Sequence, residues 1–266
     1  MKKTMTRALK ISACYIVKNE AENLVKSIKS LKNQVNEIVV VDTGSTDNTI
    51  AVARKLGAKV YSFPWQDDFS KARNFALSKA KGDWLVLLDA DEYFTANTAG
   101  NIRQIIHQAQ QADALLIQMV NYDADMAEIQ DYFYQLRIVR NQRGLHYEGK
   151  IHEELKLSDG KAMKLLRIPP ETLEIYHTGY SNSVTREKVK RNLRILQQAV
   201  ADGQSEAELA RYFCDCYLGL GDMEKCIYYG WMDVKKGRRS VNFGTRCHRV
   251  LMAYYGGRND EESISK

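Results

Sequence analysis

Three carboxylates follow an apolar run in the first half of the chain. Residues 84–88 are uniformly apolar and lead into Asp89-Ala90-Asp91-Glu92. The run is too short for a helix and too apolar for a surface strand, so it predicts a central strand of a parallel sheet, buried on both faces. Ligands bind outside the carboxyl ends of such strands, and an Asp-x-Asp pair there suits a divalent cation that carries phosphates. The alternative is that the two aspartates only end the strand and cap the next segment.

Strand and helix patterns alternate before this run. Strands are predicted at residues 9–17, 37–41 and 59–63, and helices at 20–31, from the turn after Asp42 to about 56, and at 70–79. In the turn after Asp42, Gly44 provides the bend and Ser45 or Asp47 is available as the N-cap. Repeated strand-helix units with short connections are typical of a Rossmann-like parallel sheet.

The pattern changes after the carboxylates. A helix at 99–110 is followed by strands at 114–120 and 132–140, which predict an antiparallel extension of the sheet. A hairpin is expected around residues 159–160, before a last strand in 173–180. From 183 the pattern is helical, with helices ending near 202, at 206–220, at 222–236 and at 242–255, and residues 209–229 resemble a tetratricopeptide-type helical hairpin. We therefore expect an α/β domain at 1–180 and a helical, tetratricopeptide-like region at 181–266.

Composition narrows the class of protein. The 266 residues are 44% hydrophobic and 27% charged, as in ordinary globular proteins. Five cysteines without regular spacing predict free thiols in a reducing compartment, and no apolar run is long enough to span a bilayer. We expect a cytoplasmic protein, with peripheral contact at the inner face of the membrane left open. Most of the net charge of +6 lies in the last third, where solvated helix faces explain it better than a nucleic-acid partner.

Five sequence segments in a fixed order resemble one known family. They are residues 15–20, 40–47, 69–74, 88–92, and 149–153 together with 177–180. This set resembles family 2 glycosyltransferases of the GT-A fold, in particular the subgroup with glycocin peptide glycosyltransferases and lipopolysaccharide-core transferases. The resemblance covers about residues 9–180. It implies a Rossmann-like GT-A domain with a mixed, mainly parallel sheet, and inverting transfer of a sugar from a UDP-sugar with Mn²⁺ or Mg²⁺.

The resemblance also implies a metal site. Asp91 would be the direct metal ligand, Asp89 would hold ribose or metal-bound water, and His177 would complete the coordination. A buried structural histidine on a strand is the alternative for His177. A metal in this position neutralises the charge that builds on the leaving diphosphate.

Further positions are assigned to the donor by the same resemblance. Asp42 should accept from the N3–H of uracil, and Glu20 should contact the base or ribose. Arg73 should reach the base or a phosphate, where its planar guanidinium makes paired hydrogen bonds. The remaining donor-binding positions are Tyr15, Val17 and Ala90.

Direct displacement with inversion also needs a base on the acceptor side. Glu153 is the first candidate because it lies in the resembling Gly-x-Ile-His-Glu segment, and Glu154 is left open beside it. His152 and Glu92 are the other candidates. His152 alternatively orients the loop or touches the donor phosphates.

Two other classes of enzyme fit the sequence less well than a glycosyltransferase does. A phosphatase of the haloacid dehalogenase type places Asp-x-Asp after its first strand, whereas three strands precede it here. A nicotinamide oxidoreductase would need a G-x-G-x-x-G turn, which the Asp42 turn lacks. A non-catalytic helical-repeat interaction protein with a degenerate transferase domain is the remaining alternative. The sequence does not determine which sugar is transferred or whether the protein forms a homodimer. It also leaves the acceptor open, which could be a peptide Ser or Cys, a saccharide or a lipid-linked glycan.

Overall fold

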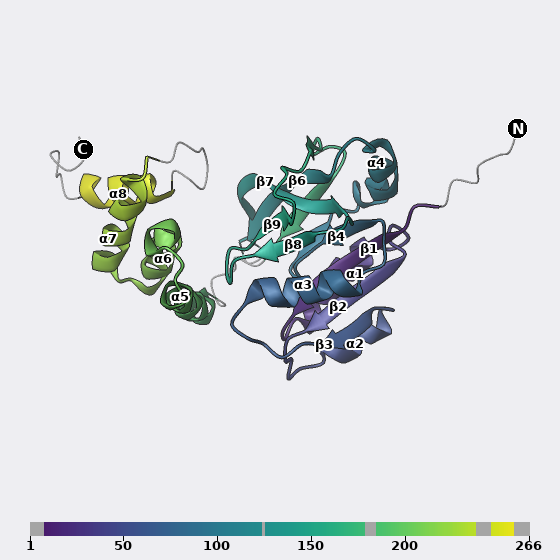
Figure 1. Cartoon of the computed structure of the whole chain (residues 1–266), viewed down its shortest axis with the longest axis horizontal. Coiled ribbons are helices and arrows are strands. Elements are labelled where there is room, and N and C mark those ends of the chain that lie inside the picture. Colours follow the sequence, from purple (N-terminus) through teal and green to yellow (C-terminus); the bar gives the residue numbers. More distant parts are fainter. Residues whose placement is uncertain (1–7, 124–125, 179–184, 238–245, 258–266) are drawn as a thin grey trace, which may run out of the picture. The chain divides into compact units, whose positions relative to one another are not determined.

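The computed structural model describes residues 8–123, 126–178, 185–237 and 246–257 (Figure 1). By their internal contacts the residues fall into two compact units, Met1–Ser181 and Asn182–Lys266. Their assignment as a transferase domain and a helical domain stays a prediction.

A nine-stranded mixed sheet forms the first unit. Its order is β3-β2-β1-β4-β7-β6-β11-β5, and β10 also pairs with β6. Parallel pairs join β1 (Ile11–Val17) to β2 (Glu37–Asp42) and β4 (Trp84–Leu87), β2 to β3 (Lys59–Ser62), and β6 (Ala114–Asp123) to β10 (Leu165–Arg167) and β11 (Glu174–His177). Antiparallel pairs join β7 (Glu128–Arg140) to β4 and β6, and β5 (Glu92–Phe94) to β11. The mainly parallel sheet and its antiparallel extension are confirmed.

Different elements cover the two faces of this sheet. On one face, α1 (Ala21–Ser30), α2 (Thr49–Lys55), the 3₁₀ turn η1 (Ala99–Asn101) and α4 (Ile102–Gln108) pack on the side chains of Trp84 and Val86. On the other face, α3 (Phe69–Lys79) and the pair β8 (Leu145–Glu148) and β9 (Glu154–Leu157) cover Leu85 and Leu87. Because successive side chains of a strand alternate between faces, the apolar run of β4 is buried on both sides, as predicted.

The prediction of a hairpin around residues 159–160 is wrong. A turn is present, since the Gly160 amide donates to the Leu157 carbonyl at 2.9 Å. The strands on either side of it, however, take other partners, because β9 pairs with β8 and β10 pairs with β6. Gly and Asp favour a chain reversal, but they do not choose the strand that pairs after it.

Some predicted helix starts also shift. Helix α1 begins at Ala21, one residue later than expected, and α2 begins at Thr49 with Asn48 at its N-cap. Asp47 still accepts from the Thr49 amide at 2.9 Å, although Ser45 does not cap the helix. The predicted strand end at 179–180, the helix start at 183–184 and residues 242–245 lie outside the described residues.

The second unit contains α5 (Thr185–Ala201), α6 (Glu206–Leu220), α7 (Met223–Val234) and α8 (Arg246–Gly256) (Figure 1). Gly221, in the left-handed conformation with φ 79°, ends α6, and Asp222 caps α7 by accepting from the Lys225 amide. Stacked rings, among them Phe213 and Tyr229 with centroids 4.7 Å apart, join the two helices into the predicted hairpin. No helix in the described parts of the chain is long and apolar enough to cross a membrane.

Candidate active site

The Asp-x-Asp turn leaves β4 at the carboxyl edge of the sheet. Its backbone is tied to β1 by the Leu88 amide, which donates to the Cys14 carbonyl at 3.2 Å, and to the end of β11 by the Thr178 amide, which donates to the Asp91 carbonyl at 3.0 Å. The turn continues into β5, where Glu92 lies opposite His177. The strand order therefore brings His177 to the carboxylates from a distant part of the sequence.

Asp91 and His177 face each other at this turn. His177 Nε2 lies 3.6 Å from Asp91 Oδ2, and the two side chains are 20% and 13% exposed. Burial lowers the pKa of His177, but the hydrogen bond and charge of Asp91 raise it more, so the pKa lies above its usual value. The side chains stand where the resemblance expects a metal site, and their role as ligands stays a prediction.

The donor set fits a cation that also binds phosphate. One carboxylate oxygen and one imidazole nitrogen are suitable ligands for Mn²⁺, and Mg²⁺ is commonly held by one or two carboxylates together with substrate phosphates. Within the described residues, no group of three or more His, Cys, Asp or Glu side chains could hold a metal ion. A cation here would therefore complete its coordination with water and substrate oxygens.

A chain of alternating charges runs beside this pair. Arg73 Nη2 donates to Asp89 Oδ1 at 2.9 Å, and Arg73 Nε donates to Glu153. Arg137 Nη2 ion-pairs with Glu92 and lies 3.4 Å from Asp89 Oδ2. Asp89 is thus held between two guanidinium groups, and each of them also holds a glutamate.

The pKa values of this chain follow from burial and charge. Burial raises the pKa of Asp89, but the guanidinium groups of Arg73 and Arg137 lower it more, and it lies well below its usual range. Burial raises the pKa of Glu92 to about 7; the nearby carboxylates add to the rise and Arg137 opposes it. Burial lowers the pKa of Arg73 and Arg137, but their carboxylate partners raise it more, so both pKa values lie above the usual value. The two guanidinium groups thus favour the charged form of Asp89, and Glu92 is enclosed at 2% exposure.

The loop between β8 and β9 carries the candidate base. Its backbone is hydrogen-bonded to the start of α3. The Phe69 amide donates to the Lys150 carbonyl at 2.8 Å, and Ser70 Oγ donates to the Gly149 carbonyl. Glu153 reaches Arg73, whereas Glu154 is exposed and lies near Lys156. Of the two glutamates, Glu153 belongs to the charged chain, and its role as the base stays a prediction.

His152 differs from its neighbour in both exposure and backbone. Its side chain is exposed, and its φ of 53° lies in the left-handed region that non-glycine residues rarely adopt. Gly149, with φ 94°, provides the other left-handed position of the loop. The loop thus turns Glu153 inward and His152 outward.

Several predicted donor positions are core side chains. Tyr15 and Val17 are 1% and 4% exposed, and Ala90 is 5% exposed. The Tyr15 hydroxyl lies 3.0 Å from Ser27 Oγ, and burial raises its pKa above the usual range. These side chains are buried in this conformation, and the donor-binding role of the three positions stays a prediction.

Asp42 is the last residue of β2, and Glu20 lies in the loop between β1 and α1. Asp42 accepts from the Gly44 and Ser45 amides at 3.0 and 3.1 Å, so its carboxylate organises its own turn. Glu20 lies in the loop after β1, where its amide donates to Thr49 Oγ1 at 2.8 Å and its carboxylate accepts from Asn23. Both residues stay at the carboxyl edge where the donor base was expected.

Sequence reasoning missed Arg137 and two other polar side chains of this region. Asn121 Oδ1 lies 2.9 Å from His177 Nδ1, and Asn121 Nδ2 donates to Asp131. The signal for Arg137 was available, since this arginine stands alone in a run that includes the buried Ile138 and Val139. Asn121 and Asp131 lie just outside the strands predicted at 114–120 and 132–140, and only the pairing of β6 with β7 brings them together.

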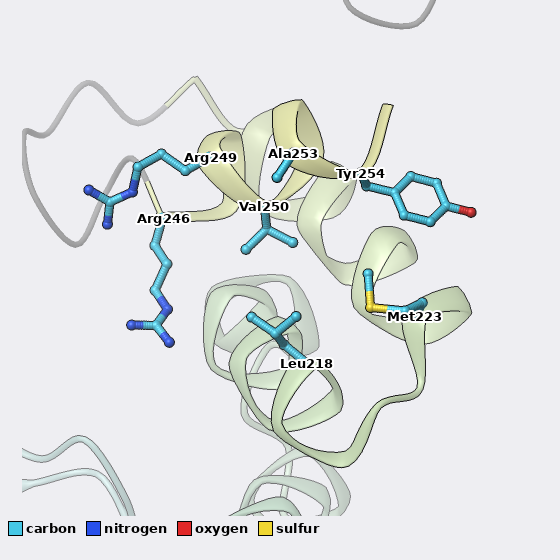
Figure 2. Close-up of a pocket in the computed structure, with 7 residues that line it drawn as sticks. All are labelled: Leu218, Met223, Arg246, Arg249, Val250, Ala253 and Tyr254. Atoms are coloured by element: carbon cyan, nitrogen blue, oxygen red, sulfur yellow. The ribbon is translucent and has the colours of Figure 1, made fainter. Parts of the chain in front are cut away.

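The helical unit has a pocket of a different kind. An open pocket of about 490 Å³ lies between α8 and the α6–α7 connection, and in Figure 2 Leu218 and Val250 point toward each other across it. Arg246 and Arg249 also line it, and Arg246 ion-pairs with Asp215. Among the described residues its lining contains no carboxylate and no imidazole. The candidate active site is that of the first unit.

Known proteins resemble both units. A TPR repeat-containing protein of Synechococcus elongatus is 31% identical over 253 residues, which cover 91% of this chain and 61% of that protein. The SPbeta prophage-derived glycosyltransferase SunS of Bacillus subtilis is 27% identical over 198 residues, 71% of this chain and 44% of SunS. The crystal structure of S. aureus TarS 1–349 in complex with UDP-GlcNAc matches with a TM-score of 0.52 and 17% identity, covering 96% of this chain and 89% of that chain. This last likeness shows the fold alone.

The family assignment comes from the sequence match. The chain spans less than two thirds of the length of these two sequence relatives. The family model for glycosyl transferase family 2, however, matches residues 12–159, more than half of the chain. With its GT-A fold, the chain belongs to glycosyltransferase family 2.

Proposed function

We propose that the protein is a metal-dependent inverting glycosyltransferase that moves a sugar from a UDP-sugar to a hydroxyl or thiol acceptor. The observation that carries this proposal is the arrangement at the carboxyl edge of the sheet. There the Asp91–His177 pair lies beside the charged chain in which Arg73 joins Asp89 to Glu153. The family and the named relatives support the same class of reaction.

Asp91 and His177 are the residues that would hold Mn²⁺ or Mg²⁺. When bound, the cation would neutralise charge that builds on the diphosphate as the glycosidic bond breaks. Arg73 and Arg137 contribute further positive charge on the side of Asp89. In the same proposal, Asp89 accepts a hydrogen bond from a ribose hydroxyl or from metal-bound water. Asp42 contacts the base, and Glu20 contacts the base or ribose.

The displacement itself needs one proton acceptor. The acceptor oxygen or sulfur forms a bond to the anomeric carbon, and the bond from that carbon to the diphosphate oxygen breaks. The electron pair of the broken bond leaves with UDP, and Glu153 takes the proton of the acceptor. Attack on the face opposite the leaving group inverts the anomeric centre.

The proposed acceptor is a molecule with a free hydroxyl or thiol. A peptide Ser or Cys and a saccharide or lipid-linked glycan all provide the required hydroxyl or thiol. The helical unit, with its arginine-lined pocket, is a candidate for acceptor contact. A homodimer and peripheral membrane contact belong to the same proposal, and light scattering and vesicle sedimentation test them.

Calorimetric titration with UDP tests the donor site. Wild-type protein should bind UDP with Mn²⁺ and much more weakly without it, and Asp91→Ala should lose the metal-dependent part. Asp159→Asn, which changes an exposed carboxylate in the turn after β9, is the matched control. Absence of UDP binding in both conditions would overturn the donor assignment. Metal-dependent binding without hydrolysis of any UDP-sugar or transfer to any acceptor would favour the non-catalytic alternative.

A further inference from the structure

Three strands place a carboxylate, an amide and an imidazole in one row. Asn121 on β6 lies opposite Asp131 on β7 and beside His177 on β11. Paired residues of neighbouring strands project from the same face of a sheet, so their side chains meet. Asn121 is only 4% exposed and lies between the other two, whereas Asp131 is exposed. A buried amide therefore connects the candidate metal site to a surface carboxylate.

The hydrogen bonds of this row have only one consistent direction. An ionised carboxylate accepts and cannot donate, so the amide nitrogen of Asn121 must face Asp131. The amide oxygen of Asn121 then faces His177, and it can only accept. His177 Nδ1, 2.9 Å away, must consequently carry the hydrogen. The opposite amide orientation would place the amide oxygen against the carboxylate oxygen of Asp131, where neither atom can donate.

This direction determines which ring nitrogen of the neutral imidazole carries the lone pair. In a neutral imidazole with hydrogen on Nδ1, the lone pair is on Nε2. Nε2 is the atom that lies 3.6 Å from Asp91 Oδ2. Two electron-pair donors that face each other at this distance are stabilised by a positive charge between them, either a proton or a cation.

We propose that Asp131 and Asn121 are positioning residues that hold His177 in the Nδ1–H tautomer, so that Nε2 and Asp91 bind one divalent cation together. The inference rests on the proposed function, because it needs the metal at Asp91 and His177. Neither Asp131 nor Asn121 touches the cation, and both act through the imidazole. Partners of this kind fix the orientation and tautomer of a metal-binding histidine, and their loss weakens metal affinity by about 10- to 100-fold.

Long-range proton–nitrogen correlation NMR of the metal-free protein tests the tautomer directly. The spectrum is recorded where the imidazole is neutral, and His177→Gln assigns its signals among the five histidines. Wild-type protein should show the Nδ1–H form. Asp131→Asn should move the population toward the Nε2–H form, because an amide in that position no longer fixes the direction of Asn121. Since Asp131 is exposed, the variant should remain folded, which a thermal melt checks.

Affinity for Mn²⁺ in the presence of UDP is the second measurement. Asp131→Asn and Asn121→Ala should each bind Mn²⁺ about 10- to 100-fold more weakly than wild type. Glu128→Gln, an exposed carboxylate on the same strand, is the matched control and should bind as wild type does. Wild-type protein that binds no Mn²⁺ with UDP would overturn the proposed function. Wild-type protein that binds it, with tautomer and affinity unchanged in Asp131→Asn, would overturn this inference alone.

Discussion

Glu153, in the loop between β8 and β9, is ion-paired with Arg73 of α3, which lies 80 residues earlier in the chain. The same guanidinium also holds Asp89, so one side chain connects the Asp-x-Asp turn to the candidate base. The side chain of Arg73 is 14% exposed, and few water molecules can replace either partner. The relative positions of Asp89 and the candidate base Glu153 depend on this one residue.

Replacement of Arg73 by lysine should therefore damage catalysis although the charge is kept. A lysine ammonium is a point charge and cannot reproduce two directed bonds from a planar fork. We expect kcat/KM for UDP-sugar hydrolysis to fall by about 100-fold, the loss typical of misplaced catalytic geometry. Arg54→Lys, the same substitution at an exposed helix position, should leave the rate unchanged. Equal rates for Arg73→Lys and wild type would show that the bridge has no part in the reaction.

Glu153→Gln and Glu154→Gln should separate the two neighbouring glutamates. Loss of a general base lowers the rate by about 10²- to 10⁴-fold, and we expect this for Glu153→Gln with little change in UDP affinity. Glu154→Gln should transfer sugar at close to the wild-type rate, because this residue is exposed. Single-turnover transfer and calorimetric UDP binding, measured on both variants, distinguish the effects. A large rate loss confined to Glu154→Gln would contradict the assignment of the base.

Much of this site was predictable because strand patterns in sequence are local. The apolar run before Asp89 fixes a central strand, and the carboxyl end of that strand fixes the edge where ligands bind. The resemblance to the family then adds His177, which no periodicity relates to Asp91. Which of Glu153 and Glu154 reaches Arg73 was not predictable, because it depends on how the left-handed Gly149 and His152 turn the loop.

The parts that sequence reasoning missed depend on pairing between distant strands. Arg137 reaches Asp89 and Glu92 because β7 lies next to β4, and Asn121 meets Asp131 because β6 pairs with β7. The wrong hairpin around residues 159–160 has the same cause, since a turn signal does not name the partner strand. Tyr15 and Val17 were assigned by resemblance; their side chains are buried, and their donor-binding role stays a prediction.

Glu37 gives the protein a pH-dependent contribution to stability. Burial raises its pKa, but Lys59, the Ser12 hydroxyl and the Lys81 amide lower it more, so the folded-state pKa is depressed. The pKa of Glu37 is lower in the folded state than in the unfolded chain, where it is about 4.3. Ionised Glu37 therefore stabilises the fold at pH values above about 4.3, and this stabilisation is lost as the pH falls through the folded-state pKa.

Urea unfolding at several pH values tests this contribution. Glu37→Gln should have a lower free energy of unfolding than wild type at neutral pH, and the difference should shrink as the pH drops below about 4. Glu22→Gln, an exposed glutamate in the first turn of α1, is the control for the loss of a carboxylate. A difference that stays constant down to the lowest pH would show that the charge of Glu37 is not the cause.

Arg137→Met should destabilise the fold through the carboxylates that it leaves behind. The arginine is 6% exposed and its partner Glu92 is 2% exposed. Removal of one partner from a buried ion pair commonly lowers the free energy of unfolding by about 3–5 kcal/mol, because the other charge stays buried without compensation. We expect a loss in this range at pH 8, where Glu92 of the wild type, with a pKa of about 7 beside Arg137, is mostly ionised and the ion pair is formed. At pH 6 the loss should be smaller, because Glu92 can then be buried in its neutral form.

The double variant Arg137→Met/Glu92→Gln separates this charge effect from lost packing. If the unpaired carboxylate causes the loss, the second substitution should restore part of the stability, and the two changes should not be additive. Urea unfolding of wild type, both single variants and the double variant completes the cycle. Additive losses that are equal at pH 6 and pH 8 would show that Arg137 stabilises the sheet by packing and not by its pairing with Glu92.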